Sequence, residues 1–208
     1  MRKRIAVGIG LLVTVIMIFN IKIGIGHFFP TYYSEAVTSY SDIYGIDSCL
    51  VYSIIKVESE FKTEAQSNKG AIGLMQIMPK TGEYISGLLG EQQYNESQLF
   101  TPEVNIRYGT YYFSKLYKDF DENVEMAISA YNAGEGNVRK WVVDEDGYRY
   151  FDVKAIPFTE TKAYLKKVKV NQIVYEYLYV DDETIFNLVS KLSKTLLYEE
   201  NFSMNTRH

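Results

Sequence analysis

The N-terminus carries the feature that most restricts how this chain folds. An uncharged apolar run covers residues 5–21, directly behind the basic residues Arg2, Lys3 and Arg4. At about 1.5 Å per residue the run spans roughly 25 Å as a helix, which is the short end of what crosses a bilayer. Basic residues before an apolar span stay on the cytoplasmic side of the membrane. We therefore expect residues 1–26 to form a separate segment and the remainder to lie outside the membrane.

Three interpretations of this run are possible. The run is longer than the usual apolar region of a signal peptide and no Ala-x-Ala site follows it, which favours a retained single-pass anchor in a bacterial cell membrane. Gly24 and Gly26 form a small-x-small pair that a signal peptidase can cut, and cleavage would give a secreted protein. A helix buried in a soluble protein is the least favoured interpretation.

The composition excludes several classes of function. The 208 residues carry 22 Lys and Arg against 26 Asp and Glu, and three of the positive charges precede the apolar run. The exported part is therefore acidic, which is the wrong sign for nucleic-acid binding. A single Cys49 excludes an intrachain disulfide, and His27 and His208 are too few for a His/Cys metal site. We expect no metal, no cofactor and no nucleic-acid partner.

The exported part shows mainly helical periodicity without a repeat or linker. This pattern predicts a short stalk over residues 24–30, one mainly helical domain over 27–180, and an amphipathic helix with a tail over 181–208. Glycines over residues 63–79 predict loops or a short hairpin. The expected helices of the domain cover residues 34–44, Asp47 to about Phe61, a stretch from Thr101, a stretch from Val124, and a long stretch from Thr159.

Glu58 is the first candidate for chemistry. It stands four residues after Ile54 and three after Ile55, so it falls on the apolar face of its helix. A carboxyl held against apolar side chains has a raised pKa and can keep its proton near neutral pH, as a general acid requires. Helix geometry alone more often places such a residue at the end of the apolar stripe, turned to solvent or to a nearby lysine. Glu60 points elsewhere on the helix, and we expect it to be solvated.

Glu58 belongs to the first of four sequence segments that together indicate a family. They are Glu58–Ser59 followed by residues 70–79, Asn105–Ile106 followed by Gly109 and Tyr112, residues 130–134, and residues 157–164. In this order and spacing, over roughly residues 35–178, the chain resembles the lytic transglycosylases of the soluble-type (SLT) catalytic domain. The resemblance implies a mainly α fold of the α+β lysozyme-like type, as a single globular domain after the N-terminal membrane helix.

The resemblance also implies a reaction. Glu58 would be the single acid and base that cleaves the β-1,4 bond between N-acetylmuramic acid and N-acetylglucosamine in peptidoglycan strands, leaving 1,6-anhydromuramyl ends. The residues carried over as substrate-binding are Ser67, Gly73, Met75, Gln76, Tyr131, Asn132, Glu160 and Tyr164. Several have a structural alternative: core packing for Met75 and Tyr131, loop stabilisation for Ser67, a turn for Asn132, and a charge at a helix start for Glu160.

Two other functions remain open from the sequence. A muramidase of the same fold would use water in place of the muramic C6 hydroxyl. A non-catalytic peptidoglycan-binding or secretion-scaffold protein would keep the groove only for docking, although such a binder has no need of a desolvated acid at Glu58. The sequence names no protein partner.

Overall fold

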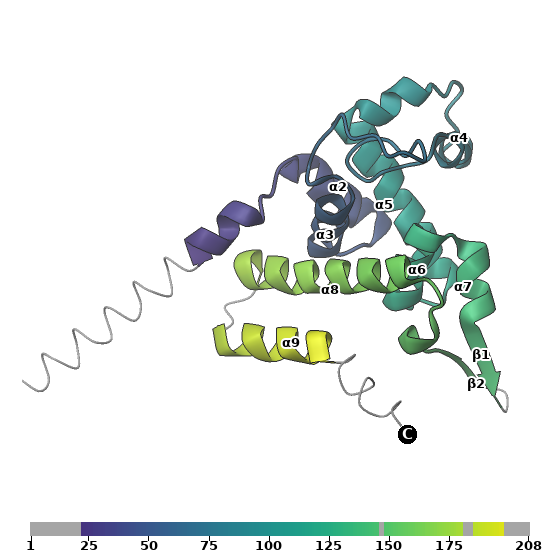
Figure 1. Cartoon of the computed structure of the whole chain (residues 1–208). Coiled ribbons are helices and arrows are strands. Elements are labelled where there is room, and N and C mark those ends of the chain that lie inside the picture. The colour runs from purple at the N-terminus through teal and green to yellow at the C-terminus, as the bar shows by residue number, and fades with distance from the viewer. Residues whose placement is uncertain (1–21, 146–147, 181–184, 198–208) are drawn as a thin grey trace, which may run out of the picture.

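The computed structural model describes residues 22–145, 148–180 and 185–197, and most of this part of the chain is helical (Figure 1). Residues 22–28 form a first helical segment. The elements that follow are α2 (Ser34–Tyr44), α3 (Ser48–Ser59), α4 (Pro79–Leu88), η1 (Glu96–Phe100), α5 (Pro102–Asp119), α6 (Val124–Ala133), α7 (Glu135–Trp141), β1 (Val142–Glu145), β2 (Tyr148–Phe151), η2 (Val153–Ala155), α8 (Thr159–Tyr179) and α9 (Ile185–Leu197).

The core forms where α3 packs along α8, with α2, α5 and α6 around them (Figure 1). α3 begins at the expected cap, because the Asp47 side chain accepts a hydrogen bond of 2.9 Å from the Leu50 backbone N–H. Val51, Ile54 and Ile55 are fully buried on its inner face. Burying each such side chain contributes about 1.5–3 kcal/mol relative to exposure, so this burial holds the helix in place.

The segment between α3 and α4 is a compact loop with little regular structure. Its two isolated bridges pair Gln66 with Ile72 and Ile72 with Ile77. This agrees with the expectation of loops or a short hairpin over residues 63–79. α4 begins with Pro79 at its first position and is not among the helices predicted from the sequence. Two glycines interrupt the apolar pattern over this helix.

The described strands form one two-stranded antiparallel hairpin, in which Val142 pairs with Phe151 and Glu145 with Tyr148. It projects from the end of α7 (Figure 1). The mainly helical class is confirmed. The hairpin itself is not predicted from the sequence, in which it is not distinguished from the helices on either side.

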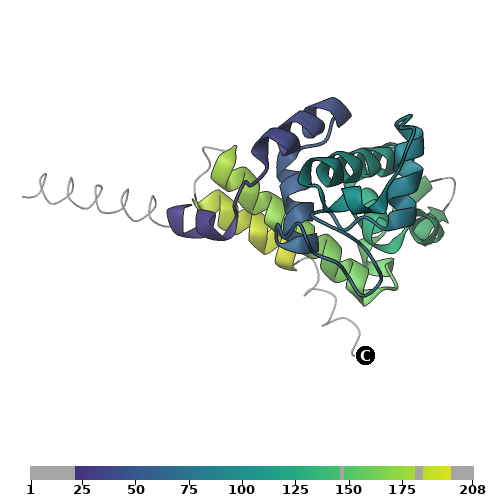
Figure 2. The same ribbon diagram turned by 90° about the horizontal axis from the view of Figure 1, so that it is seen from above.

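The N-terminal helical segment and α9 lie together at the end of the molecule away from α4 (Figure 2). A small second cluster holds them there, in which Ile25 and Leu188 pack against Val174 and Tyr177 of α8. Residues 24–28, part of the expected stalk over residues 24–30, are helical in the structure, and Ile25 is partly buried in this cluster.

The apolar run at residues 5–21, predicted to be the membrane anchor, lies outside the described residues. Within the described ranges, none of the helices combines the length and the apolar character needed to cross a bilayer.

Candidate active site

Glu58 lies in the last turn of α3, where the helix stops abruptly. Glu60 and Phe61 both have left-handed backbone angles, with φ of 50° and 65°, so the chain turns away immediately after Ser59. The turn leaves Glu58 half-buried at the end of the inner face of α3, while Glu60 points outward with its side chain 74% exposed. The structure thus separates the two acids as the helical spacing predicted.

The environment of Glu58 favours the protonated carboxyl. Burial raises its pKa from the usual 4.5 to about 7, because the charged form loses its hydration. The Tyr164 hydroxyl donates a hydrogen bond of 2.6 Å to Glu58 Oε1, which lowers the pKa and so offsets part of the burial effect. A carboxyl with a pKa of about 7 is present in both protonation states at neutral pH, so it can act as an acid and then as a base.

Two tyrosines from different helices lie beside this carboxyl. Tyr164 belongs to α8 and Tyr131 to α6, and burial raises the pKa of both hydroxyls well above the usual value. Both therefore remain neutral donors. The Tyr131 hydroxyl donates to the backbone carbonyl of Met75 at 2.8 Å. Tyr164 is thus the tyrosine that contacts Glu58, whereas Tyr131 holds the loop that faces it.

A buried amide fixes this loop. Asn105 is fully buried in α5, and its Oδ1 accepts a 2.7 Å hydrogen bond from the Met75 N–H. Its Nδ2 donates to the carbonyls of Ile72 at 2.9 Å and Leu99 at 2.6 Å. One side chain therefore pairs with three buried backbone groups. The Ile72 carbonyl also accepts from the Ile77 N–H at 2.9 Å, whereas the Met75 N–H and the Leu99 carbonyl would each cost about 1–3 kcal/mol if left unpaired.

Close packing explains why two positions of the motifs are occupied by glycine. Gly73 has φ of 78°, and a Cβ there would lie 2.4 Å from the Leu99 carbonyl oxygen. Gly109 of α5 packs directly against the Met75 side chain, and a Cβ at Gly109 would lie 2.3 Å from the methionine sulfur. The Met75 side chain is accordingly fully buried beneath the loop. Gly73 and Met75 shape the loop from inside.

Ser67 and Gln76 stabilise the same loop through their polar groups. Ser67 Oγ accepts a hydrogen bond of 2.9 Å from the Ala71 N–H. Gln76 Nε2 donates to the carbonyls of Ala65 and Gly73 at 3.1 and 2.9 Å. Both side chains are half-buried. Their expected contact with sugar stays a prediction.

The last two predicted residues lie at the end of α6 and at the start of α8. Asn132 Oδ1 accepts a 2.8 Å hydrogen bond from the buried Thr161 hydroxyl, which ties the end of α6 to the first turn of α8. Glu160 is exposed in that turn. The Asn132 contact helps to fix the position of α8 and therefore of Tyr164.

The positioning roles of Ser59, Asn105 and Thr161 are not predicted from the sequence. Ser59 Oγ donates to the Leu74 carbonyl at 2.8 Å, which joins the end of α3 to the loop. The signal available in the sequence was a small polar residue at an apolar position of a helix, as at Asn105 beside Ile106. Such a residue must find a partner when it is buried.

The chain is similar to known proteins in sequence and in fold. The family described as Transglycosylase SLT domain matches residues 35–151. Over 162 residues the chain is 34% identical to the soluble lytic murein transglycosylase of Escherichia coli K12, a match that covers 76% of this chain and 25% of that protein. Over 159 residues it is 35% identical to the membrane-bound lytic murein transglycosylase C of Actinobacillus pleuropneumoniae serotype 5b, covering 65% and 43%.

Solved structures give the same result. An inactive mutant of lytic transglycosylase Slt from Pseudomonas aeruginosa has a TM-score of 0.66 at 35% identity, covering 71% of this chain and 24% of that one. The complex of a 70-kDa soluble lytic transglycosylase with bulgecin A has a TM-score of 0.67 at 34% identity, covering 74% and 25%. The chain spans about a quarter of the soluble relatives that it matches. With the described fold and the matched motifs, it belongs to the transglycosylase SLT domain family, which has a lysozyme-like fold.

Proposed function

We propose that this protein is a peptidoglycan lytic transglycosylase in which Glu58 is the single acid and base. The observation that carries this proposal is the state of Glu58, a half-buried carboxyl with a pKa of about 7 and a neutral tyrosine donor at 2.6 Å. A carboxyl that only stabilised the fold would gain nothing from losing its hydration. The soluble and membrane-bound relatives named as lytic murein transglycosylases support the same reaction.

The first step uses the protonated form of Glu58. The carboxyl transfers its proton to the oxygen between N-acetylmuramic acid and N-acetylglucosamine, the bond from that oxygen to the muramic C1 breaks, and positive charge develops on the muramic ring. The new carboxylate keeps the hydrogen bond from Tyr164, which stabilises the charge that has just formed.

The second step uses the carboxylate. Glu58 accepts the proton of the muramic C6 hydroxyl while that oxygen bonds to C1, which closes the 1,6-anhydro ring. The proton lost in the first step is regained, and no water is consumed. Among the residues that the structure describes, burial and the Tyr164 hydrogen bond are the influences on the pKa of Glu58, which fits a scheme with one carboxyl in place of the usual two.

The remaining predicted residues act around this carboxyl. Gln76 and Glu160 have exposed or half-buried side chains and are proposed to contact the glycan directly, together with Ser67 and Asn132. Gly73 and Met75 are proposed to act through the backbone shape of the loop. Tyr131 is proposed to hold that loop beside the reacting sugar.

We also propose that residues 5–21 anchor the protein in the bacterial cell membrane with the enzyme domain outside. The basic tip before the run and the membrane-bound relatives support this topology. If the segment is cleaved, the domain is secreted instead. An anchored enzyme would act on glycan close to the membrane.

Product analysis tests the function. The full chain in non-ionic detergent digests purified peptidoglycan beside the Glu58→Gln variant, and mass spectrometry identifies the soluble products. We expect anhydromuramyl ends from the wild type and no cleavage by the variant, which lacks a transferable proton. Reducing ends heavier by one water would replace this proposal with a muramidase. Binding of peptidoglycan without any cleavage by the wild type would replace it with a scaffold.

A further inference from the structure

Tyr112 of α5 belongs to the sequence motifs, but the reaction described above gives it no role. It stands seven residues after Asn105 and three after Gly109, so the three residues share one stripe of the helix. Asn105 and Gly109 both contact Met75, which belongs to the loop between α3 and α4. Tyr112 is the next position of this stripe, where α5 continues past the contact with Met75.

The ring of Tyr112 packs against the ring of Tyr131. Their centroids lie 5.7 Å apart, and the planes are tilted by 52°. The Tyr131 hydroxyl donates to the Met75 carbonyl, and burial together with the nearby Glu58 carboxylate raises the pKa of this hydroxyl. Tyr131 therefore lies beside the reacting carboxyl, and Tyr112 is separated from Glu58 by one aromatic side chain.

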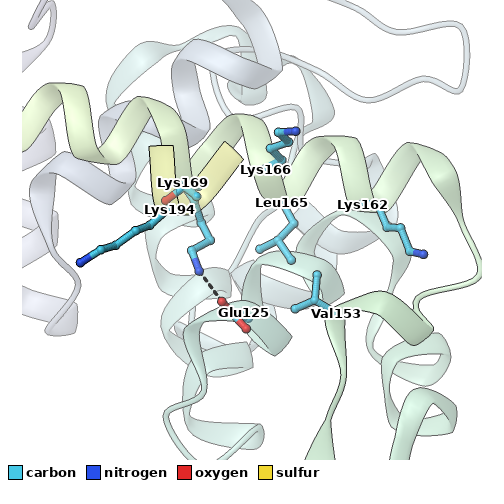
Figure 3. A pocket seen from close by; sticks show the side chains of 8 residues that line it. Glu125, Val153, Lys162, Leu165, Lys166, Lys169 and Lys194 are labelled. Atoms are coloured by element: carbon cyan, nitrogen blue, oxygen red, sulfur yellow. Dashed lines mark hydrogen bonds and ion pairs between the residues drawn. The ribbon is translucent and has the colours of Figure 1, made fainter. Parts of the chain in front are cut away.

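Contacts at both ends of α6 fix the position of Tyr131. Near the start of α6, Glu125 forms an ion pair with Lys169 of α8 (Figure 3). Near its end, Asn132 accepts a hydrogen bond of 2.8 Å from Thr161 of α8. The ring of Tyr112 thus packs against a fixed neighbour, so little of its side-chain freedom remains to be lost when a ligand binds.

The hydroxyl of Tyr112 is available to a ligand. It has no hydrogen-bond partner among the residues that the structure describes, yet it is not one of their buried unpaired oxygens, which belong to Ser41, Ser129 and Tyr177. The Tyr112 oxygen therefore reaches solvent, although the residue as a whole is half-buried. Burial raises the pKa of this hydroxyl, so it stays protonated and can both donate and accept a hydrogen bond.

A neutral hydroxyl on a fixed ring suits an uncharged polar ligand. Sugar hydroxyl and acetamido groups offer both donors and acceptors. After burial, Glu135 of α7 and the half-exposed Tyr84 of α4 also raise the pKa of Tyr112, so both lie near its hydroxyl and add polar groups there. Because glycan is a polymer, a strand cut at Glu58 continues beyond the two sugars at the cleaved bond and needs further contacts of this kind.

We propose that Tyr112 is a further substrate-binding residue, whose hydroxyl forms a hydrogen bond with a sugar of the strand beyond the two sugars at the cleaved bond. The inference rests on the proposed function for the identity of the substrate. This hydrogen bond is present before and during the reaction alike, so it strengthens the binding of the strand without changing the chemical step.

Titration of inactive protein tests the proposal. The full-length Glu58→Gln protein in non-ionic detergent is titrated into fluorescently labelled glycan strands without peptides, and anisotropy gives Kd. Adding Tyr112→Phe removes the hydroxyl and keeps the ring, and it should raise Kd about five- to tenfold. The matched control is Tyr111→Phe, because this neighbouring ring packs against Tyr44 with centroids 5.3 Å apart. The control should leave Kd within about twofold.

Three results would overturn the proposal. The first is an equal Kd for the Tyr112→Phe and Tyr111→Phe proteins. The second is the absence of any binding of strands by the Glu58→Gln protein. The third is a Tm that falls by more than about 5 °C when Tyr112→Phe is added, because the hydroxyl would then have a partner within the fold.

Turnover separates this inference from the proposed function. With Glu58 intact, Tyr112→Phe should raise KM for glycan strands about five- to tenfold and leave kcat and the pH profile unchanged. A lower kcat at unchanged KM would make Tyr112 a positioning residue for Tyr131 and overturn the binding role. Failure of the wild type to cleave peptidoglycan would sink the proposed function alone, because the titration decides the role of Tyr112 with inactive protein.

Discussion

Replacing Tyr164 by Phe should move the pH dependence of the enzyme upward. The substitution removes the 2.6 Å hydrogen bond to Glu58 and keeps the ring in its buried site. A hydrogen bond to a charged group contributes about 1.5–3 kcal/mol, which corresponds to about 1–2 pH units. Because this bond lowers the pKa of Glu58, its loss should raise that pKa from about 7 to about 8 or 9.

The sign of the kinetic effect follows from the first step. The free enzyme must hold the proton on Glu58, so kcat/KM falls as the pH rises through its pKa. In the Tyr164→Phe variant this alkaline fall should occur about 1–2 pH units higher. The variant also loses a donor to the carboxylate formed in that step, so kcat should fall about tenfold or more.

The assay is the rate of release of anhydromuramyl products from soluble glycan strands, measured from about pH 5 to about pH 10. Tyr131→Phe is the matched control, because its hydroxyl binds the Met75 carbonyl and gives Glu58 no hydrogen bond. That variant should lower the rate and leave the alkaline fall near pH 7. An unmoved or lowered pKa in Tyr164→Phe would refute this account of Glu58, whatever happened to the rate.

Three further predictions concern stability. The pKa of Glu58 is higher in the folded protein than in the unfolded chain, so the folded state loses stability as the pH rises from about 4.5 to about 7. Glu58→Gln should therefore raise the free energy of unfolding by about 3 kcal/mol at pH 8 and change it little at pH 4. Thermal unfolding at both pH values measures this difference. Gly73→Ala should lower the free energy of unfolding by about 3 kcal/mol or more in denaturant unfolding, because the new Cβ would clash with a backbone carbonyl. Gly87→Ala in α4 is the control: a Cβ there meets nothing within 4 Å, so the variant should be more stable by about 0.5–1 kcal/mol. Asn105→Ala should cost about 2–6 kcal/mol in denaturant unfolding and abolish cleavage, because the buried Met75 N–H and Leu99 carbonyl lose their partner. A cost under about 1 kcal/mol would contradict this role.

The sequence predicted best what local spacing determines. The cap at Asp47, the burial of Ile54 and Ile55, and the inward position of Glu58 all follow from one helical pattern, and the structure has all three. The helix over residues 34–44 also has the predicted bounds. Where glycine propensity and tertiary packing disagreed, as over residues 24–28, packing decided the outcome.

Spacing could not predict which tyrosine contacts Glu58. Tyr131 and Tyr164 lie 73 and 106 residues beyond it in the chain, and each has a buried hydroxyl that needs a partner. The choice depends on how α6 and α8 are placed against α3, and this placement depends on remote contacts such as the one between Asn132 and Thr161. A sequence pattern identifies the two donors, but their acceptors are set by tertiary structure.

The division between the two tyrosines has a consequence for how substitutions in this domain act. α8 presents Tyr164 to the carboxyl, so changes that shift α8 should alter the pKa of Glu58 and the pH profile. α6 presents Tyr131 to the loop, so changes that shift α6 should alter the position of the glycan at unchanged acidity. Thr161 lies at the contact between these helices, through its hydrogen bond to Asn132. A substitution there should therefore disturb the pH profile and the binding of glycan together.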